Sequence, residues 1–340
     1  MGRVYQSKHQ LNILLGSSLI FVFVIQAKKI PVQPPTFKLN DGNEIPAIAL
    51  GTGRGTAKES ETLEDVRQAV YWAIEAGYRH IDTAAVYFDE EQVGQGIAQA
   101  IADKLVTRKD LYITTKLWND KHRREQVVPA LKDSLKKLGL DYVDLYLIHF
   151  PVAVKADGSS DDVHYVDTWK GMMEAKELGL TRSIGVSNFN TTQIADLIQR
   201  TKVVPAVNEI EVNPTLTQEA LVNYCQSQGI VVMGYSPFGF LVSRRSASAP
   251  PPRSDDPVLV AMAQKYGKTT AQIVLRYLIE RGIVPIPKST NKARIVQNKD
   301  IFDFSLTPAE VEAINKFNKN IRVISISSWQ NYPLYPFCEY

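Results

Sequence analysis

The chain has few of the residues that build metal sites, disulfide frameworks and nucleic-acid interfaces. It contains two cysteines and five histidines in 340 residues. Cys225 and Cys338 match no metal-ligand or redox spacing, so we expect packed or unpaired thiols and no metal. The formal net charge is only +3, with basic and acidic residues interleaved. This gives no electrostatic basis for binding nucleic acid, and we expect a small-molecule partner.

The sequence also lacks an apolar run long enough to cross a membrane. Arg3 and Lys8 precede an apolar stretch over residues 13–25, shorter than the roughly 20 residues of a spanning helix. Basic residues, an apolar stretch and then the small residue Ala27 are the order of a secretory signal. We predict that residues 1–27 are a cleaved signal peptide and that the secreted protein has no stable membrane association. The alternatives are an uncleaved membrane anchor and a buried or disordered extension.

A third absence concerns dinucleotide binding. An open, doubly wound sheet carries Gly-x-Gly-x-x-Gly after its first strand, with an acidic residue about 20 positions later. Residues 51–55 (GTGRG) have the wrong spacing, and residues 94–96 (GQG) lie within a helical pattern. This favours a closed barrel over a doubly wound sheet.

Short apolar runs alternate with longer helical periods from residue 36 onwards. An Asp-Gly pair at residues 41–42 predicts a hairpin between residues 36–39 and 44–46. The predicted strands are residues 47–50, 80–82, 112–116, 143–149, 183–186, 206–211, 231–235 and 284–287. The predicted helices are residues 63–76, 93–102, 127–138, 194–199, 220–228 and 270–281, with a late helix from Thr307.

Eight strands separated by helices predict one α/β domain over residues 28–340. Its expected fold is a (β/α)₈ TIM barrel with an N-terminal β-hairpin and long loops at the C-terminal face. The longest irregular stretch, residues 236–257, follows the seventh strand and is typical of a lid or a disordered loop.

Four residues with reactive side chains stand at or just after the ends of three consecutive predicted strands. Asp82 ends the second strand, Tyr87 follows five residues later, Lys116 ends the third and His149 ends the fourth. Each alone has an ordinary structural explanation, such as a helix cap or a packed ring. The carboxyl ends of barrel strands form one mouth, however, so we expect the four to converge there as a catalytic site.

The segments around these residues resemble the signatures of the aldo-keto reductases. The segments are GYRHIDTA at residues 77–84, YVDLYLIH at 142–149 and IPKS at 286–289, and the resemblance covers about residues 36–340. It implies that Tyr87 is a general acid, that Lys116 and Asp82 tune it, and that His149 orients the carbonyl. The implied function is NADPH-dependent reduction of a small-molecule ketone or aldehyde to an alcohol.

This reaction requires side chains of these types. Hydride delivered to a carbonyl carbon leaves negative charge on the oxygen, which must be stabilised and protonated. A free tyrosine, with a pKa of about 10, is a weak acid at neutral pH. We expect the Lys116 ammonium to lower the pKa of Tyr87, and Asp82 to keep Lys116 charged and aimed at the phenol. A neutral His149 would donate a hydrogen bond to the carbonyl oxygen.

The same resemblance implies where the cofactor binds. Tyr235 is expected to stack on the nicotinamide, and Glu209 replaces a glutamine common in the family. An ionised glutamate accepts but does not donate hydrogen bonds, so the orientation of the carboxamide stays open. Two cations and two hydroxyls after the last strand suit a phosphate monoester and favour NADPH over NADH. The expected cofactor-binding residues are Thr52, Asp82, Ser187, Asn188, Glu209, Tyr235, Ser236, Phe238, Gly239, Lys288, Ser289, Thr290, Arg294, Gln297 and Asn298.

The expected substrate pocket has lost aromatic bulk. Gly53 and Phe150 stand where many relatives carry tryptophan, which suits a larger, rigid substrate. The expected substrate-binding residues are Tyr87, Trp118, His149 and Phe150. Aromatic residues of the tail close over the mouth or pack in the core: Trp329, Tyr332, Tyr335, Phe337 and Tyr340.

The substrate and the setting follow from these features together. A wide pocket and secretion make the chain similar to the insect reductases of 3-dehydroecdysone, a steroid ketone. A general aldehyde or ketone reductase is the alternative, and a non-catalytic barrel that binds NADPH or a hormone is the alternative of another class. We expect a monomer. Asn190 begins a glycosylation sequon beside the expected carboxamide site, and we predict that it carries no glycan.

Overall fold

The computed structural model describes residues 33–53, 62–243, 250 and 253–337. The predicted signal peptide at residues 1–27 lies outside this part of the chain, as do Cys338 and Tyr340. The fold below concerns the described residues.

Eight parallel strands form the centre of the fold, and their order in the sheet follows the chain. The Ala49 N–H donates to Pro285 O and the Gly51 N–H to Pro287 O, each at 3.1 Å, so the first strand bonds to the last. The sheet therefore closes into the predicted barrel, and the doubly wound alternative is wrong. The strands are β3 (Leu50–Gly51), β4 (His80–Asp82), β5 (Tyr112–Leu117), β6 (Val143–Ile148), β7 (Thr181–Ser187), β8 (Val207–Glu211), β9 (Val231–Tyr235) and β10 (Ile283–Pro285).

The predicted hairpin covers the amino-terminal end of this barrel. Strands β1 (Thr36–Lys38) and β2 (Glu44–Pro46) pair antiparallel. The Asn40 side chain donates to Pro205 O at 2.8 Å, ahead of β8, and Asn43 donates to Arg182 O at 3.3 Å, at the start of β7. The opposite, carboxyl-terminal end is left as the mouth.

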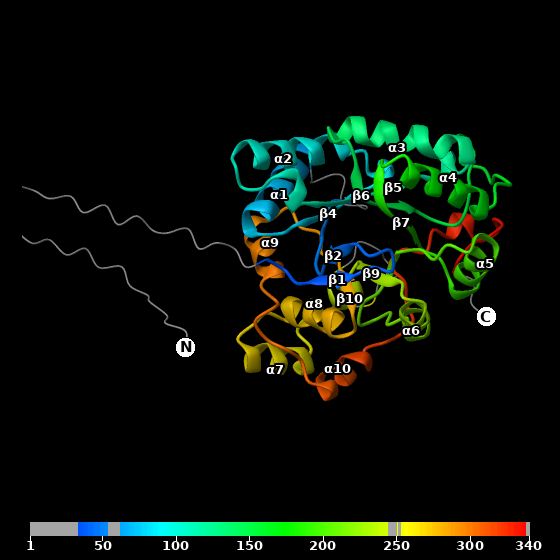
Figure 1. Cartoon of the computed structure of the whole chain (residues 1–340). Helices are drawn as coiled ribbons and strands as arrows, with labels where there is room; N and C mark the ends of the chain where they lie inside the picture. Colours follow the sequence, from blue (N-terminus) through cyan, green and yellow to red (C-terminus); the bar gives the residue numbers. More distant parts are fainter. Residues whose placement is uncertain (1–32, 54–61, 244–249, 251–252, 338–340) are drawn as a thin grey trace, which may run out of the picture. The chain divides into compact units, whose positions relative to one another are not determined.

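Helices surround the strands (Figure 1). Their apolar faces explain their positions: in α3, Val127, Leu131, Leu135 and Leu138 are buried, and Gly139 ends the helix with a φ of +66°. The helices are α1 (Leu63–Ala76), α2 (Glu90–Ala102), α3 (Arg124–Leu138), α4 (Tyr165–Glu177), α5 (Thr191–Thr201), α6 (Glu219–Ser227), α7 (Pro257–Tyr266), α8 (Thr270–Glu280), α9 (Lys292–Lys299) and α10 (Pro308–Asn315).

Helices α4, α7 and α9 were not anticipated from the sequence. In α4 the apolar pattern is interrupted by Thr168 and Gly171, both of which are buried. A Cβ at Gly171 would lie 2.7 Å from the carbonyl oxygen of Arg124, so glycine is needed where α4 approaches α3. In α9 only Ile295 and Asn298 are buried, and two buried positions are too few to show a helical period in the sequence.

Alternation along the strands divides the core into two layers. On β6, Leu145 and Leu147 point into the barrel, while Tyr146 and Ile148 face the surrounding helices. The inner layer consists of Leu39, Ile45, Ala49, Tyr112, Leu145, Leu147, Ala206, Val207, Met233, Val284 and Ile286. The residues two positions beyond Leu147 and Val207 are His149, just past β6, and Glu209 on β8, and alternation places both on the inner face towards the mouth.

Candidate active site

Strand alternation places several polar side chains inside the barrel at its mouth. Lys116 lies four residues after the inward-facing Tyr112 on β5, and His149 lies two residues after Leu147, just past β6. On β4, Ile81 faces the helices, so Asp82 points inwards. These three strands are neighbours in the sheet. The convergence predicted from the sequence is therefore confirmed.

Lys116 is fully buried and held by an ion pair. Its Nζ donates to Asp82 Oδ1 at 2.6 Å, to Asp82 Oδ2 at 2.8 Å and to the Thr83 carbonyl at 3.1 Å. The Lys116 side chain is 0% exposed and that of Asp82 is 3% exposed. Burial lowers the pKa of Lys116, but Asp82 and Glu209 more than offset this and raise it above its ordinary value. The ammonium therefore stays charged, as expected.

Tyr87 lies over this ammonium at the end of a short 3₁₀ helix, η1 (Ala85–Tyr87). Lys116 Nζ is 5.4 Å from the centroid of the Tyr87 ring. The ring is also 5.7 Å from the His149 ring, edge to face. On its other side the backbone of Gly53 comes so close that a Cβ there would lie 3.1 Å from Tyr87 Cζ. The close approach of the Gly53 backbone thus limits where the phenol ring can lie.

The pKa of Tyr87 departs from the sequence expectation. Burial raises it above its ordinary value, and although Lys116 acts to lower it as expected, Asp82 and Glu209 oppose Lys116. The expected net lowering is therefore wrong for the protein alone, because a half-buried phenol beside two carboxyls resists ionisation. His149 follows expectation: burial, reinforced by Lys116, lowers its pKa well below the ordinary value and keeps the imidazole neutral.

Glu209 makes a contact that the sequence did not anticipate. It was expected beside the carboxamide, and in addition its Oε1 lies 3.2 Å from Lys116 Nζ. Burial and the neighbouring Asp82 raise the pKa of Glu209 well above its ordinary value. The signal was available in the alternation of β8, since Val207 faces inwards and Glu209 is two residues further along.

The residues expected at the carboxamide form one hydrogen-bonded group. Asn188 donates to the His149 carbonyl at 2.9 Å and accepts from the Tyr235 hydroxyl at 2.7 Å. Ser187 donates to the carbonyl of Glu209 at 2.8 Å. The ends of strands β7, β8 and β9 are thereby hydrogen-bonded, directly or through one another, to the backbone of His149. The hydroxyl of the half-buried Tyr235 is thereby held in place.

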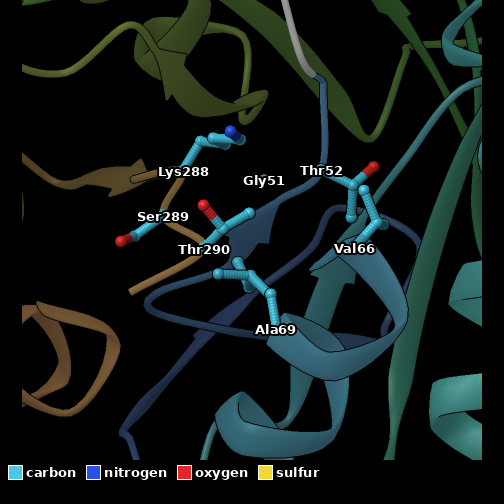
Figure 2. A pocket seen from close by; sticks show the side chains of 8 residues that line it. Gly51, Thr52, Val66, Ala69, Lys288, Ser289 and Thr290 are labelled. Carbon is cyan, nitrogen blue, oxygen red and sulfur yellow. The ribbon is translucent and has the colours of Figure 1, made fainter. Parts of the chain in front are cut away.

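The residues expected to bind phosphate lie at the other side of the mouth. Figure 2 shows a small pocket with Lys288, Ser289 and Thr290 on one side and Thr52 and Val66 on the other. The Gly51–Lys288 bridge that helps to close the barrel positions them. The residues that line the pocket include one lysine and three residues with hydroxyl groups, side-chain types that suit an anion.

The remaining expected cofactor residues lie on two neighbouring segments. Ser236 and Phe238 follow β9, and Gly239 begins η4 (Gly239–Leu241). A Cβ at Gly239 would lie 2.1 Å from Asn213 Oδ1, so this glycine is needed for a close approach of backbone. On α9, Arg294 and Gln297 are exposed and Asn298 is buried. Arg294 lies in the first turn of α9, four residues after Thr290.

The expected substrate residues form an aromatic wall that leads outwards from His149. Trp118 is 5.2 Å from the His149 ring and Phe150 is stacked on it at 5.4 Å, measured between ring centroids. Trp329 of the tail lies 5.9 Å from Trp118 and 5.5 Å from Phe150. Phe337 lies 6.3 Å from Phe150. The tail thus packs against the wall of the pocket, as predicted.

Side chains that hold the tail were missed from the sequence. Glu211 accepts the backbone N–H groups of Val323 and Ile324 at 2.8 and 3.0 Å. Asn190 donates to Pro336 O at 3.2 Å, and Gln193 donates to Leu334 O at 2.8 Å. The partners are 112 to 146 residues apart in the sequence, so no local pattern reveals them.

The described residues contain a free thiol and no evident metal site. Cys225 is a buried free thiol, in agreement with expectation. No group of three or more His, Cys, Asp or Glu side chains in the described ranges is placed to hold a metal ion. Within that same part of the chain, none of the helices combines the length and the apolar character needed to cross a bilayer.

Comparison with known proteins gives close relatives over nearly the whole chain. The chain is 70% identical over 305 residues to aldo-keto reductase AKR2E4 of Bombyx mori, covering 90% of this chain and 99% of that protein. It is 42% identical over 316 residues to prostaglandin F synthase 1 of Bos taurus, covering 89% and 97%.

Solved structures agree with this relationship. The crystal structure of B. mori AKR2E4 in complex with NADP superimposes with a TM-score of 0.88 at 70% identity, covering 90% of this chain and 99% of that one. The silkworm aldo-keto reductase AKR2E5, complexed with NADPH, gives a TM-score of 0.87 at 44% identity, covering 90% and 94%. The Aldo/keto reductase family model matches residues 47–319. The chain therefore belongs to the aldo/keto reductase family.

Proposed function

We propose that this protein reduces a ketone or aldehyde to an alcohol with NADPH as the hydride donor. The observation that carries the proposal is the arrangement around Lys116: a buried ammonium held by Asp82, with the Tyr87 and His149 rings facing the same space. A buried ion pair that serves only stability is commonly replaceable by apolar side chains. Here it lies directly beneath a phenol at the mouth of the barrel, which is the place of catalysis in this fold.

Each of the four side chains has a role that its surroundings support. Neutral His149 donates a hydrogen bond that holds the carbonyl oxygen beside the Tyr87 hydroxyl. Tyr87 transfers its proton to that oxygen as negative charge develops there. Lys116 stabilises the phenolate that remains, and Asp82 keeps Lys116 charged. Because burial raises the pKa of Tyr87, the phenol is protonated at neutral pH and ready to donate.

The residues present fit NADPH, which when bound supplies the hydride. Tyr235 offers a ring face fixed by Asn188, and Ser187 lies beside them for the carboxamide. At the other end, Lys288 with its neighbouring hydroxyls and Arg294 on α9 suit a phosphate monoester. We therefore propose NADPH as the cofactor in preference to NADH. The other residues proposed to line this site are Thr52, Glu209, Ser236, Phe238, Gly239, Ser289, Thr290, Gln297 and Asn298.

The substrate that we propose is a bulky ketone such as the steroid 3-dehydroecdysone. A flat, rigid skeleton matches a wall made of Trp118, Phe150 and Trp329, whose rings contact one another. Gly53 adds room, because it contributes no side chain to the side of the pocket next to Tyr87.

We also propose that the mature enzyme is a secreted monomer that begins at about Lys28. The support is the order of basic, apolar and small residues within residues 1–27. An ecdysteroid ketone dissolved in body fluid is a substrate that such an enzyme would meet.

A substrate panel with NADPH tests the function. The protein starting at Lys28 is assayed for loss of reduced-cofactor absorbance with an ecdysteroid ketone and with small aromatic aldehydes. We expect turnover with the ecdysteroid, at a higher kcat/KM than with the aldehydes. Preference for the aldehydes would favour a general detoxifying reductase, and no turnover with any carbonyl would favour a non-catalytic binding barrel.

A further inference from the structure

Glu209 places a second buried carboxyl against Lys116, so that one ammonium faces two acids. Glu209 Oε1 lies 3.2 Å from Lys116 Nζ, whereas both oxygens of Asp82 contact that atom, at 2.6 and 2.8 Å. None of the three side chains is more than 3% exposed. The two carboxyl groups are also within hydrogen-bonding reach of each other. The reaction proposed above assigns no role to this second acid.

The charges of this cluster do not balance if both acids are ionised. Two carboxylates and one ammonium would leave a net negative charge away from water, and buried groups avoid this by taking up a proton. Glu209 Oε2 is moreover buried with no hydrogen-bond partner among the described residues. Two carboxylates have no hydrogen to share, whereas one proton placed between them supplies the missing donor.

We propose that Glu209 is a neutral carboxylic acid in the folded protein, donates its proton to Asp82, and is a positioning residue that holds Asp82 against Lys116. Asp82 is the acid that stays ionised, because both of its oxygens face the ammonium. The direction of the pKa shift of Glu209 agrees, since burial and the Asp82 carboxylate both raise it. A glutamate in this form carries a donor, as the glutamine it replaces does.

The part of this inference that concerns the reaction rests on the proposed function. Ionised Glu209 would place a further negative charge near Tyr87 and make the phenolate costlier to form. The titratable groups that interact electrostatically with Glu209 come from four elements of the mouth: Asp82 (β4), Tyr87 (η1), Lys116 (β5) and Tyr235 (β9). Burial keeps His149 neutral and raises the pKa of Tyr235 well above its ordinary value. Glu209 is therefore the member of this cluster whose charge changes first as pH rises.

Glu209→Gln removes the titration while keeping the shape of the side chain. The unfolded chain releases the Glu209 proton near the ordinary pKa, but the folded chain keeps it to a higher pH. Between these two values the unfolded state binds fewer protons, so the stability of the wild type falls as pH rises through the folded-state pKa. The Tm of Glu209→Gln should therefore rise relative to wild type over this window, by about 2 °C for each unit of pKa shift.

Infrared spectroscopy at neutral pH detects the proton directly and needs neither cofactor nor activity. The wild-type spectrum minus that of Glu209→Gln should show the C=O stretch of a protonated carboxyl. Asp82→Asn provides a second test that retains Glu209. In that variant Glu209 becomes the one carboxyl of the cluster facing Lys116, so it should ionise and the band should disappear although the residue is still present.

Measurements of kcat then test whether the proton on Glu209 affects the reaction. The ratio of kcat for Glu209→Gln to that for wild type should rise steadily from pH 6, where both side chains are neutral, to pH 9. Tyr87 stays protonated over this range because burial raises its pKa. Glu211→Gln is the matched control: it removes a buried carboxyl two residues along β8 that bonds the tail and not Lys116. Its kcat ratio to wild type should not change with pH.

The possible results separate the two proposals. A wild-type-minus-Glu209→Gln spectrum without the protonated-carboxyl band, or a Tm difference that does not change with pH, would each overturn the assignment of the proton. A wild type that oxidises no NADPH with any carbonyl would instead overturn the proposed function, and the infrared and Tm measurements would still decide whether Glu209 is protonated.

Discussion

The two ends of the expected cofactor site handle charge in opposite ways. Around Lys116 the charged groups are shut away from water and neutralise one another within the fold. At the other end Lys288 is half-buried and Arg294 is exposed on the first turn of α9. The buried cluster is complete once the chain has folded, whereas the exposed Arg294 acts fully only when a phosphate displaces water from it. We expect the first region to control kcat and the second to control cofactor affinity.

Tyr87→Phe is the substitution expected to separate the roles of the two regions most strongly. Removing the hydroxyl removes the proton that the carbonyl oxygen must receive, while the ring can still pack against Gly53. We expect kcat to fall by roughly 10³-fold or more, in the range of general acid catalysis, with NADPH affinity within a few-fold of wild type. The measurements are steady-state kinetics and fluorescence titration of the cofactor. Equal loss of turnover and of binding would mean that Tyr87 is not the general acid.

Arg294→Gln is the reciprocal test at the exposed end. Loss of a bidentate charge-assisted contact to a phosphate should raise the KM for NADPH about 10- to 100-fold with kcat nearly unchanged. NADH, which lacks that phosphate, should be affected little. Lys292→Gln is the matched control, because Lys292 is an exposed cation on the same helix that pairs with Glu75 at 2.7 Å. If both variants weaken NADPH equally, general charge and not a phosphate contact explains the effect.

Gly53→Ala is expected to have a smaller effect, confined to the catalytic end. The new methyl group would lie 3.1 Å from Tyr87 Cζ, closer than ordinary van der Waals contact, so the ring must shift by a few tenths of an ångström. We expect a several-fold fall in kcat, since small displacements of a catalytic group are costly, and no change in the affinity for NADPH. A variant with unchanged kcat on both bulky and small carbonyls would show that the close contact at Gly53 has no bearing on catalysis.

The contacts of the catalytic region also differ in how far they could be predicted from the sequence alone. Strand ends and the rule that they meet at one mouth were enough to bring Asp82, Lys116 and His149 together, because alternation of side chains is a local property. The contact between Glu209 and Lys116 depends on how β8 and β5 face each other across a closed barrel. That distance follows from the closure of the sheet and not from any spacing in the chain.

The net pKa of Tyr87 could not be predicted from the sequence for a similar reason. The sequence correctly predicted that Lys116 acts to lower the pKa of Tyr87. Burial, together with the Asp82 carboxylate, outweighs it, and both depend on tertiary packing. Helices α4 and α9 escaped prediction because close approach at Gly171 and a short exposed helix both weaken the apolar period.

The smallest expected effect concerns Asn190, which lies between the catalytic end and the tail. Its Nδ2, the atom that a glycan would modify, donates to Pro336 O at 3.2 Å, and its Oδ1 accepts the N–H of Gln193 at 2.9 Å at the start of α5. A glycan on Nδ2 would displace Pro336 and with it the neighbouring Phe337, which contacts Phe150. We therefore expect the intact mass of the secreted protein to equal that of the bare chain from Lys28, unchanged by glycosidase treatment. A glycosylated and fully active protein would show that the tail can leave α5 without loss of the pocket.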